Sequence, residues 1–286
     1  MYYDTIISSN IDDLYKQSIQ KVIDTGEKVT ARGLDFIESR FQHLILTNPR
    51  ARIVANTARK LSKKFLAAEF IWIMSGSPWL DQIEFYNKRM REFSDDGISL
   101  HGAYGPRLRH WSLQHGDVDQ LENCLKRLKD DIFTRQAVII IIDPAVDFTV
   151  KTRDVPCNNY LQFLYRDKKL HLMCYVRSND LFLGFPYDVS HWTILQEMYA
   201  SALGVEVGEY HHIVGSLHIY ENNIEKMKSI ATQFVTNTNM PKMPKLESLS
   251  SIINELKKVE ENYRKTGEFC FDHLDKYWQD FLSWLK

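Results

Sequence analysis

The strongest constraint on the fold of this chain is a pair of apolar-rich segments joined by a short polar connection. Residues 159–166 (NYLQFLYR) and 169–176 (KLHLMCYV) flank Asp167, Lys168 and Lys169. Two such runs on either side of a short polar turn predict a β-hairpin. The hairpin must lie in a larger sheet, because an isolated hairpin is marginally stable in water.

Helices and strands are mixed around this hairpin without strict alternation, which predicts a single α+β domain built on one sheet. The expected helices are 11–25, 61–74, 80–93, 118–129 and 189–203, the last ending at Gly204. The expected further strands are 137–143, a continuous apolar run typical of a strand buried on both faces, and 209–220. Residues 236–248 read as a surface loop punctuated by prolines, and the last 40 residues as mostly helical.

Composition excludes several classes of protein. The net charge of −1 marks no general nucleic-acid or membrane surface, and the longest apolar run, 137–142, is too short to span a bilayer. The N-terminus has no basic start followed by an apolar run, so no secretory signal is expected. The four cysteines form no C-x-x-C pair, which predicts a cytoplasmic protein with free thiols and no bound metal.

Cys157 is a candidate nucleophile. It follows Pro156 at the start of the hairpin, where a loop-to-strand junction can expose its sulfur. A nucleophilic thiolate needs a cation nearby, and Arg177 lies twenty residues on, across the hairpin. Arg177 beside Ser178 is also suited to grip a phosphate. The alternatives are a buried structural cysteine and a surface arginine.

Three further polar positions stand out. His218 and Tyr220 fall on one face of a strand and could bind sugar hydroxyls, although such a pair is more often packing. Glu69 lies in the middle of an apolar helix, where a buried carboxylate is either paired or functional. Asp188 precedes the expected helix 189–203, where it is either the N-cap or a chemical group.

The order of these residues resembles the thymidylate synthase family from about residue 13 to about residue 245. The resemblance rests on AAEFIWIMSG, HGAYGPRLRHW, DVPCNNYLQF, YVRSNDLFLGFPYDVSHWTIL, GVEVGEY and VGSLHIYENN. It implies a catalytic domain over residues 1–245, with 246–286 as a helical extension packed on that domain. It also implies a twisted sheet with flanking helices and a homodimer through the sheet.

The resemblance assigns roles residue by residue. Cys157 would attack carbon 6 of a pyrimidine nucleotide, after which carbon 5 takes the one-carbon unit of 5,10-methylenetetrahydrofolate. The implied catalytic residues are Cys157, Glu69, Asp188, Tyr104 and Asp180. The implied nucleotide-binding residues are Arg32, Arg135, Arg177, Ser178, Asn158, His218 and Tyr220, with Arg135 lent by the neighbouring subunit. The implied folate-binding residues are Arg59, Met90, Asp180 and Gly184.

Departures from the family pattern indicate the substrate. Synthases have Asn where this chain has Asp188. An Asn amide matches the oxygen 4 and ring N–H of uracil, whereas cytosine offers an amino donor and a bare ring nitrogen. An Asp that shares a proton with the ring matches cytosine, so Asp188 predicts the cytidylate hydroxymethylase branch. Asn158 and Ser216 stand where synthases have His and Asp.

Other departures indicate that water, rather than hydride, completes the reaction. Met90 replaces the tryptophan that lies against folate in synthases, with Phe93 the nearest aromatic residue, and the C-terminus lacks their short closing tail. The predicted product is 5-hydroxymethylcytidylate, with dCMP favoured over CMP. Gln136 replaces a second arginine, so one fewer cation holds the phosphate. The alternatives are a synthase that methylates dUMP and an inactive nucleotide-binding homologue.

Overall fold

The computed structural model of the protein describes residues 5–113, 116–233, 235 and 239–286. These residues form two compact units. The first contains residues up to 61 together with 157–200 and 205–241, and the second contains 62–156, 201–204 and 242–286. Most of the candidate residues, including Cys157 and Asp188, belong to the first unit.

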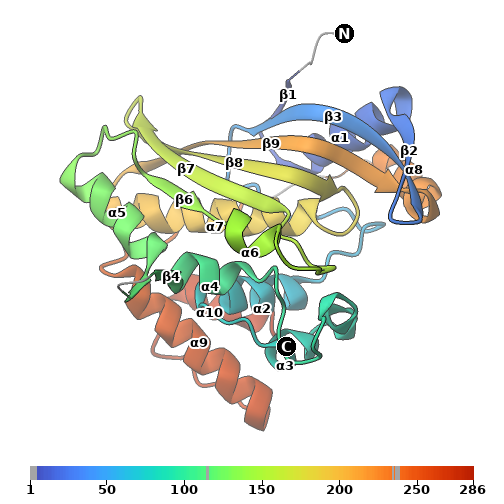
Figure 1. The fold of residues 1–286 in the computed structure, drawn as a ribbon. Helices are drawn as coiled ribbons and strands as arrows, with labels where there is room; N and C mark the ends of the chain where they lie inside the picture. Colours follow the sequence, from blue (N-terminus) through green and yellow to red (C-terminus); the bar gives the residue numbers. More distant parts are fainter. Residues whose placement is uncertain (1–4, 114–115, 234, 236–238) are drawn as a thin grey trace. The chain divides into compact units, whose positions relative to one another are not determined.

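The first unit is built on a mixed sheet, whose strands run side by side in Figure 1. Its strands are β1 (Ile6–Ser8), β2 (Glu27–Ala31), β3 (Leu34–Leu46), β7 (Asn158–Arg166), β8 (Lys169–Asp180) and β9 (Glu206–Tyr220). The order is β1-β3-β9-β8-β7, with β2 paired to β3. β1 lies parallel to β3 and β8 parallel to β9, whereas β3–β9 and β7–β8 are antiparallel.

The hairpin predicted from the sequence is present. β7 and β8 pair from Arg166 and Lys169 at the turn to Asn158 and Val176. Asp167 and Lys168 form the turn with φ of 51° and 61°. Positive φ at both central residues is the geometry of the two-residue turn that matches strand twist. The strand predicted over 209–220 is also present, as the longer β9.

The helices of the first unit are α1 (Ile11–Thr25), α7 (Phe185–Leu203) and α8 (Ile224–Thr232), with a 3-10 turn over Glu221–Asn223. α1 has the predicted bounds, and the Asn10 side chain caps it by accepting from the Asp13 N–H. The expected start of the next helix at 189 is wrong, because α7 begins at Phe185. Asp188 therefore lies within its first turn, where its N–H donates to the Gly184 carbonyl.

A buried ion pair ties α7 to the chain that follows β3. Arg52 and Glu197 are almost completely buried, and the Arg52 guanidinium contacts the Glu197 carboxylate and the Thr193 carbonyl. Arg50 Nε lies 2.7 Å from the other Glu197 oxygen. Gln196 donates to the carbonyls of Leu170 and Gly208, which joins the same helix to β8 and β9. The helix that carries Asp188 is thereby fixed to the sheet.

The second unit is mostly helical. Its elements are α2 (Lys63–Met74), α3 (Leu80–Glu84), a 3-10 helix η1 (Lys88–Phe93), α4 (Tyr104–Arg109), β4 (Trp111–Leu113), β5 (Gly116–Val118), α5 (Gln120–Asp130), β6 (Val138–Ile140), α6 (Pro144–Asp147), α9 (Leu249–Thr266) and α10 (Lys276–Ser283). α2 packs against α4 and α9.

Two expectations about this unit are wrong. The helix predicted over 80–93 is broken, because the Asn87 side chain accepts from the Arg89 N–H and starts η1 as a separate helix. The run 137–143 forms only the short strand β6, and Ile140 is 42% exposed, so the strand is not buried on both faces. An apolar run alone does not show which of its side chains pack against another helix or strand.

The C-terminal 40 residues form α9 and α10, as the sequence predicted. In the expected loop 236–248, residues 236–238 lie outside the described part, and 239–247 contain no helix or strand. Within the described ranges, no helix combines the length and apolar character needed to cross a bilayer.

Candidate active site

Cys157 and Arg177 meet where β7 begins. The Arg177 N–H donates to the Cys157 carbonyl at 2.9 Å, which pairs the two backbones. The Arg177 Nη2 lies 4.0 Å from the Cys157 Sγ, and Cys157 is only half-buried. A guanidinium at this distance favours the thiolate, the reactive form of cysteine. The structure thus confirms the proximity predicted for these two residues.

Asp188 lies among amide groups rather than at a helix end. Its Oδ1 accepts from Asn158 Nδ2 at 2.9 Å and its Oδ2 from Asn179 Nδ2 at 2.7 Å. Burial raises the pKa of the Asp188 carboxyl to about 6, against the lowering effect of these two hydrogen bonds. Both of these hydrogen bonds come from side chains rather than from backbone N–H groups of α7, so the carboxylate does not act as a helix cap.

Further hydrogen bonds fix which end of each amide faces Asp188. Asn158 Oδ1 accepts from Trp192 Nε1 at 3.1 Å and from the Cys174 thiol at 3.3 Å. Asn179 Oδ1 lies 2.9 Å from His212 Nε2. Burial lowers the pKa of His212 to about 3, so the ring is neutral and donates through Nε2 to the amide oxygen. Both amide NH₂ groups therefore point at Asp188.

The sequence reasoning missed Asn179 and His212 in this network. Asn179 lies between two residues that were singled out, Ser178 and Asp180. Its burial breaks the alternation of β8, in which every second residue from Leu170 to Val176 is buried and Ser178, the next in step, is only half-buried. Gly184 supports the network, because a Cβ at this position would come within 2.9 Å of Asn179 Nδ2. Because Asn179 is out of phase with the buried residues of β8, the strand pattern carries no signal that could have found it.

Asp180 occupies the end of β8. Its Oδ1 accepts from the Phe182 N–H at 2.8 Å, whereas its Oδ2 is buried without a hydrogen-bond partner in the part of the chain that the structure describes. Burial raises the pKa of Asp180, and the charge of Arg59 opposes this effect. Arg59 is buried, with its guanidinium 4.6 Å from the centre of the Phe182 ring. The Oδ2 atom is suited to accept from a ligand N–H.

His218 and Tyr220 lie on one face of β9, as predicted. Their ring centres are 5.1 Å apart, and Phe36 of β3 packs against His218 at 5.2 Å. His218 Nδ1 lies 3.2 Å from the Ser216 carbonyl. Burial raises the pKa of Tyr220, and the charge of Arg32 opposes this rise.

Arg32 itself is exposed in the β2–β3 turn with a φ of 51°. Ser178 is half-buried between Arg177 and Asn179 on β8.

Four of the candidate residues belong to the second unit. Glu69 is in α2, Met90 in η1, Tyr104 at the start of α4, and Arg135 in the segment between α5 and β6. Glu69 is half-buried rather than buried, which corrects the expectation from its apolar neighbours, and Arg135 is exposed. Their roles remain proposals.

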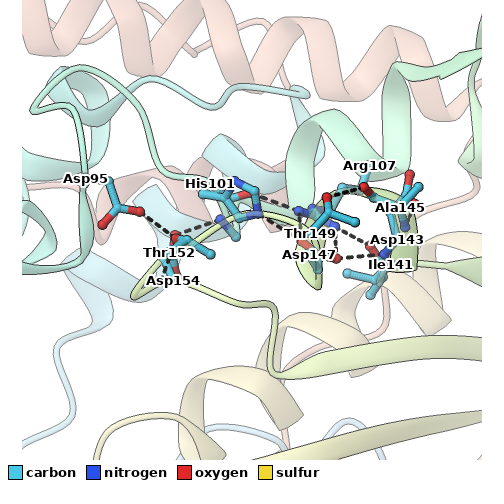
Figure 2. Close-up of polar contacts among 11 residues, drawn as sticks. Asp95, His101, Arg107, Ile141, Asp143, Ala145, Asp147, Thr149, Thr152 and Asp154 are labelled. Carbon is cyan, nitrogen blue, oxygen red and sulfur yellow. Dashed lines mark hydrogen bonds and ion pairs between the residues drawn. The ribbon is translucent and has the colours of Figure 1, made fainter.

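The segment that leads to Cys157 is held by polar contacts within the second unit (Figure 2). Arg107 Nη1 and Nη2 each lie 2.7 Å from an oxygen of Asp147, and His101 Nε2 lies 3.1 Å from Asp147 Oδ1. Asp154 Oδ2 accepts from the Gly102 N–H at 2.8 Å. Paired Arg–carboxylate bonds of this kind are geometrically specific. Together, these contacts restrain the chain as far as Asp154, which lies three residues before Cys157.

Comparison with known proteins agrees with these local arrangements. The family model for thymidylate synthase matches residues 13–265. The chain belongs to the thymidylate synthase family. Members of this family of one-carbon transferases bind a nucleoside monophosphate and use methylenetetrahydrofolate as co-substrate. The thymidylate synthase fold and the family resemblance expected from the sequence are thus confirmed.

The chain is similar to two phage proteins of this family. The deoxyuridylate hydroxymethyltransferase of Bacillus phage SP01 is 32% identical over 280 residues, covering 94% of this chain and 73% of that protein. The deoxyuridylate hydroxymethyltransferase of Pseudomonas phage M6 is 31% identical over 204 residues, covering 69% of this chain and 56% of that protein. This chain therefore spans little more than half the length of the second relative.

The raised pKa of Asp188 leads to a pH-dependent stability. The carboxyl ionises near 3.8 in the unfolded chain and about 6 in the folded one. Relative to Asp188→Asn, the free energy of unfolding of the wild type is expected to fall as pH rises from about 4 to about 6, and then to level off. Urea unfolding of both proteins across this range measures the difference.

Asp24→Asn is the matched control, because Asp24 is an exposed acid at the end of α1. The difference in free energy of unfolding between the wild type and Asp24→Asn should not fall between pH 4 and pH 6. A wild type whose stability runs parallel to that of Asp188→Asn throughout would contradict the raised pKa.

Proposed function

We propose that the protein transfers a hydroxymethyl group to carbon 5 of cytidylate from 5,10-methylenetetrahydrofolate and water. The observation that carries the proposal is the donor-only environment of the Asp188 carboxylate. With its pKa near 6, Asp188 is mostly ionised at neutral pH, and the amides of Asn158 and Asn179 already point their donors at it. Its remaining lone pairs can accept from an exocyclic amino group, as in cytosine.

The same environment disfavours uracil at neutral pH. Oxygen 4 of uracil is an acceptor, and it would face a carboxylate oxygen with no proton between them. Uracil could bind only to the protonated Asp188, whereas cytosine can share one proton between its ring nitrogen and the carboxyl. A pKa raised toward neutrality makes such sharing easier.

In the proposed reaction the Cys157 thiolate adds to carbon 6 of the base, favoured by the Arg177 guanidinium 4.0 Å from its sulfur. Carbon 5 then forms a bond to the methylene carbon of the folate and loses its proton. Tetrahydrofolate leaves without being oxidised, which produces an exocyclic methylene. Water adds to this group, and Cys157 is released.

The remaining assignments follow from the family resemblance. Arg177, Ser178 and Arg32 are proposed to hold the phosphate, and His218 with Tyr220 the sugar hydroxyl. The half-buried state of Arg177 and Ser178 and the exposure of Arg32 leave all three reachable by a ligand. Asp180 is proposed to accept from the folate through its unpartnered buried oxygen. Glu69, Tyr104, Asn158, Arg59, Met90 and Gly184 complete the proposed set.

Deoxyuridylate is the competing substrate, because both relatives are named for it. Asp188 in its protonated form could donate to uracil oxygen 4 and accept from the ring N–H. Methylation of dUMP by a thymidylate synthase is a third candidate. The three differ in base and in product, so a single assay separates them.

The assay incubates the protein with methylenetetrahydrofolate and dCMP, CMP or dUMP, and identifies products by mass. The expected result is 5-hydroxymethylcytidylate with no dihydrofolate, because water rather than hydride completes the reaction. Cys157→Ser is the control and should give no product, since a hydroxyl is a much weaker nucleophile than a thiolate. Hydroxymethyldeoxyuridylate alone would overturn the cytidylate assignment, and dihydrofolate formation would overturn hydroxymethyl transfer.

We further propose that the protein is a homodimer in which Arg135 serves the partner's site. In support, Arg135 is exposed within its own unit, two residues from Phe133, which is 61% exposed. An exposed large aromatic side chain beside a cation is typical of an interface.

Mixing Arg135→Ala with Cys157→Ala subunits tests this arrangement. Random exchange makes half of the dimers mixed, each with one intact site, so about a quarter of wild-type activity should return. The matched control mixes Cys157→Ala with Arg177→Ala, whose side chains act in the same subunit and should not complement each other. Equal activity in both mixtures would contradict action across an interface.

A further inference from the structure

Three strands of the first unit place a group of histidines and a carboxylate on one face of the sheet. His43 comes from β3, His171 from β8, and Glu209 and His211 from β9. One ligand atom each from His171, Glu209 and His211 lies within 4.8 Å of the others. These residues are all half-buried, whereas their neighbours Leu172, Tyr210 and His212 are buried on the opposite face.

The spacing of two of these atoms fits a tetrahedral metal ion. His211 Nε2 lies 3.4 Å from Glu209 Oε2, which is long for a hydrogen bond. Zinc–nitrogen and zinc–oxygen bonds of about 2.0–2.1 Å at the tetrahedral angle place two ligand atoms about 3.3 Å apart. The pair is therefore already separated as two ligands of one ion would be.

His171 is held beside this pair in a specific position. A Cβ on Gly208 would come within 2.8 Å of the His171 ring, so only glycine allows the ring to lie here. The Glu209 N–H donates to His171 Nδ1 at 3.1 Å. His171 Nε2 is buried and finds no hydrogen-bond partner among the described residues. An ion bound at Nε2 would give this nitrogen a partner. The ring proton would then lie on Nδ1, and the Glu209 N–H would lose Nδ1 as its acceptor.

His43 supports the group from the adjacent strand. Its Nε2 lies 3.0 Å from His211 Nδ1, the nitrogen of that ring turned away from Glu209. A metal-bound histidine usually donates its other ring N–H to a neighbouring acceptor, which fixes the orientation of the ring. His43 is in place to be this acceptor for His211.

We propose that His171, Glu209 and His211 bind a divalent transition-metal ion of the zinc class, with His43 as the supporting residue. Two imidazoles and one carboxylate suit zinc, and they do not suit magnesium or calcium, which prefer oxygen ligands. His171 and His211 also line a hollow of about 220 Å³, which leaves room for water as a fourth ligand. The cysteine pattern gave no hint of this site, because its ligands are histidines and a glutamate from separate strands.

The proposed ion is remote from the candidate active site. His171 is six residues from Arg177 along β8, which corresponds to about 20 Å in a strand. The site is therefore structural or regulatory, and metal binding can be measured independently of the reaction. Failure of this inference would leave the proposed function untouched, and the reverse also holds.

The test uses the full-length protein after chelator treatment and dialysis. Titration with zinc chloride should show one ion per chain with a dissociation constant below about 1 μM, and cobalt(II) should give the intense visible absorption of a tetrahedral site. His211→Gln and Glu209→Gln should each weaken zinc binding at least about 100-fold, and His43→Gln about 10- to 100-fold.

His273→Gln is the matched control. His273 is another histidine paired with a glutamate, Nε2 lying 3.2 Å from Glu255 Oε2, but outside the proposed site. Its loss should leave zinc binding unchanged, and circular dichroism checks that every variant is folded. Absence of stoichiometric binding by the folded wild type, or equal binding by His211→Gln and His273→Gln, would overturn the proposal.

Discussion

The carboxylate of Asp188 is held between two amides whose orientations are fixed by deeper partners. Trp192 and the Cys174 thiol orient Asn158, and His212 orients Asn179. A buried polar network of this kind is stable only when each member is satisfied, because an unpaired buried group costs about 1–3 kcal/mol. The network thus joins the start of β7, the end of β8 and α7 into one rigid support.

This support also determines what the candidate active site can recognise. Because both amide NH₂ groups point at Asp188, the carboxylate offers a ligand only hydrogen-bond acceptors, unless the carboxylate takes up a proton. Cys157, the proposed nucleophile, directly precedes Asn158, and Arg177 pairs with Cys157 across the hairpin. The proposed base recognition and the placement of the proposed nucleophile therefore depend on the same few hydrogen bonds.

Local patterns predicted much of the fold. The hairpin turn at Asp167, the helix 11–25 and the shared face of His218 and Tyr220 depend on spacing within short stretches, and all three are present. The proximity of Cys157 and Arg177 followed from the hairpin itself. Each of these features needs only the period of a helix or strand, which the sequence displays directly.

Features that depend on tertiary contacts could not be predicted in this way. The sequence placed Asp188 before its helix, because the Gly-Phe-Pro-Tyr stretch looks like a turn, yet Pro is well tolerated in the first turn of a helix. The roles of Asn179 and His212 depend on side chains brought together from β8 and β9. The histidine group on the opposite face likewise appears only when three strands are aligned.

The most direct test of the central claim is the effect of Asp188→Asn on base preference. Asn158 and Asn179 both aim NH₂ groups at position 188 and are held by Trp192 and His212, so neither offers an acceptor to the NH₂ of a new Asn. That NH₂ is best satisfied by an acceptor such as oxygen 4 of uracil, and it does not match the amino group of cytosine. The ratio of kcat/KM for dCMP over dUMP should fall about 10- to 100-fold relative to the wild type. An unchanged ratio in a folded variant would contradict the role of Asp188 in reading the base.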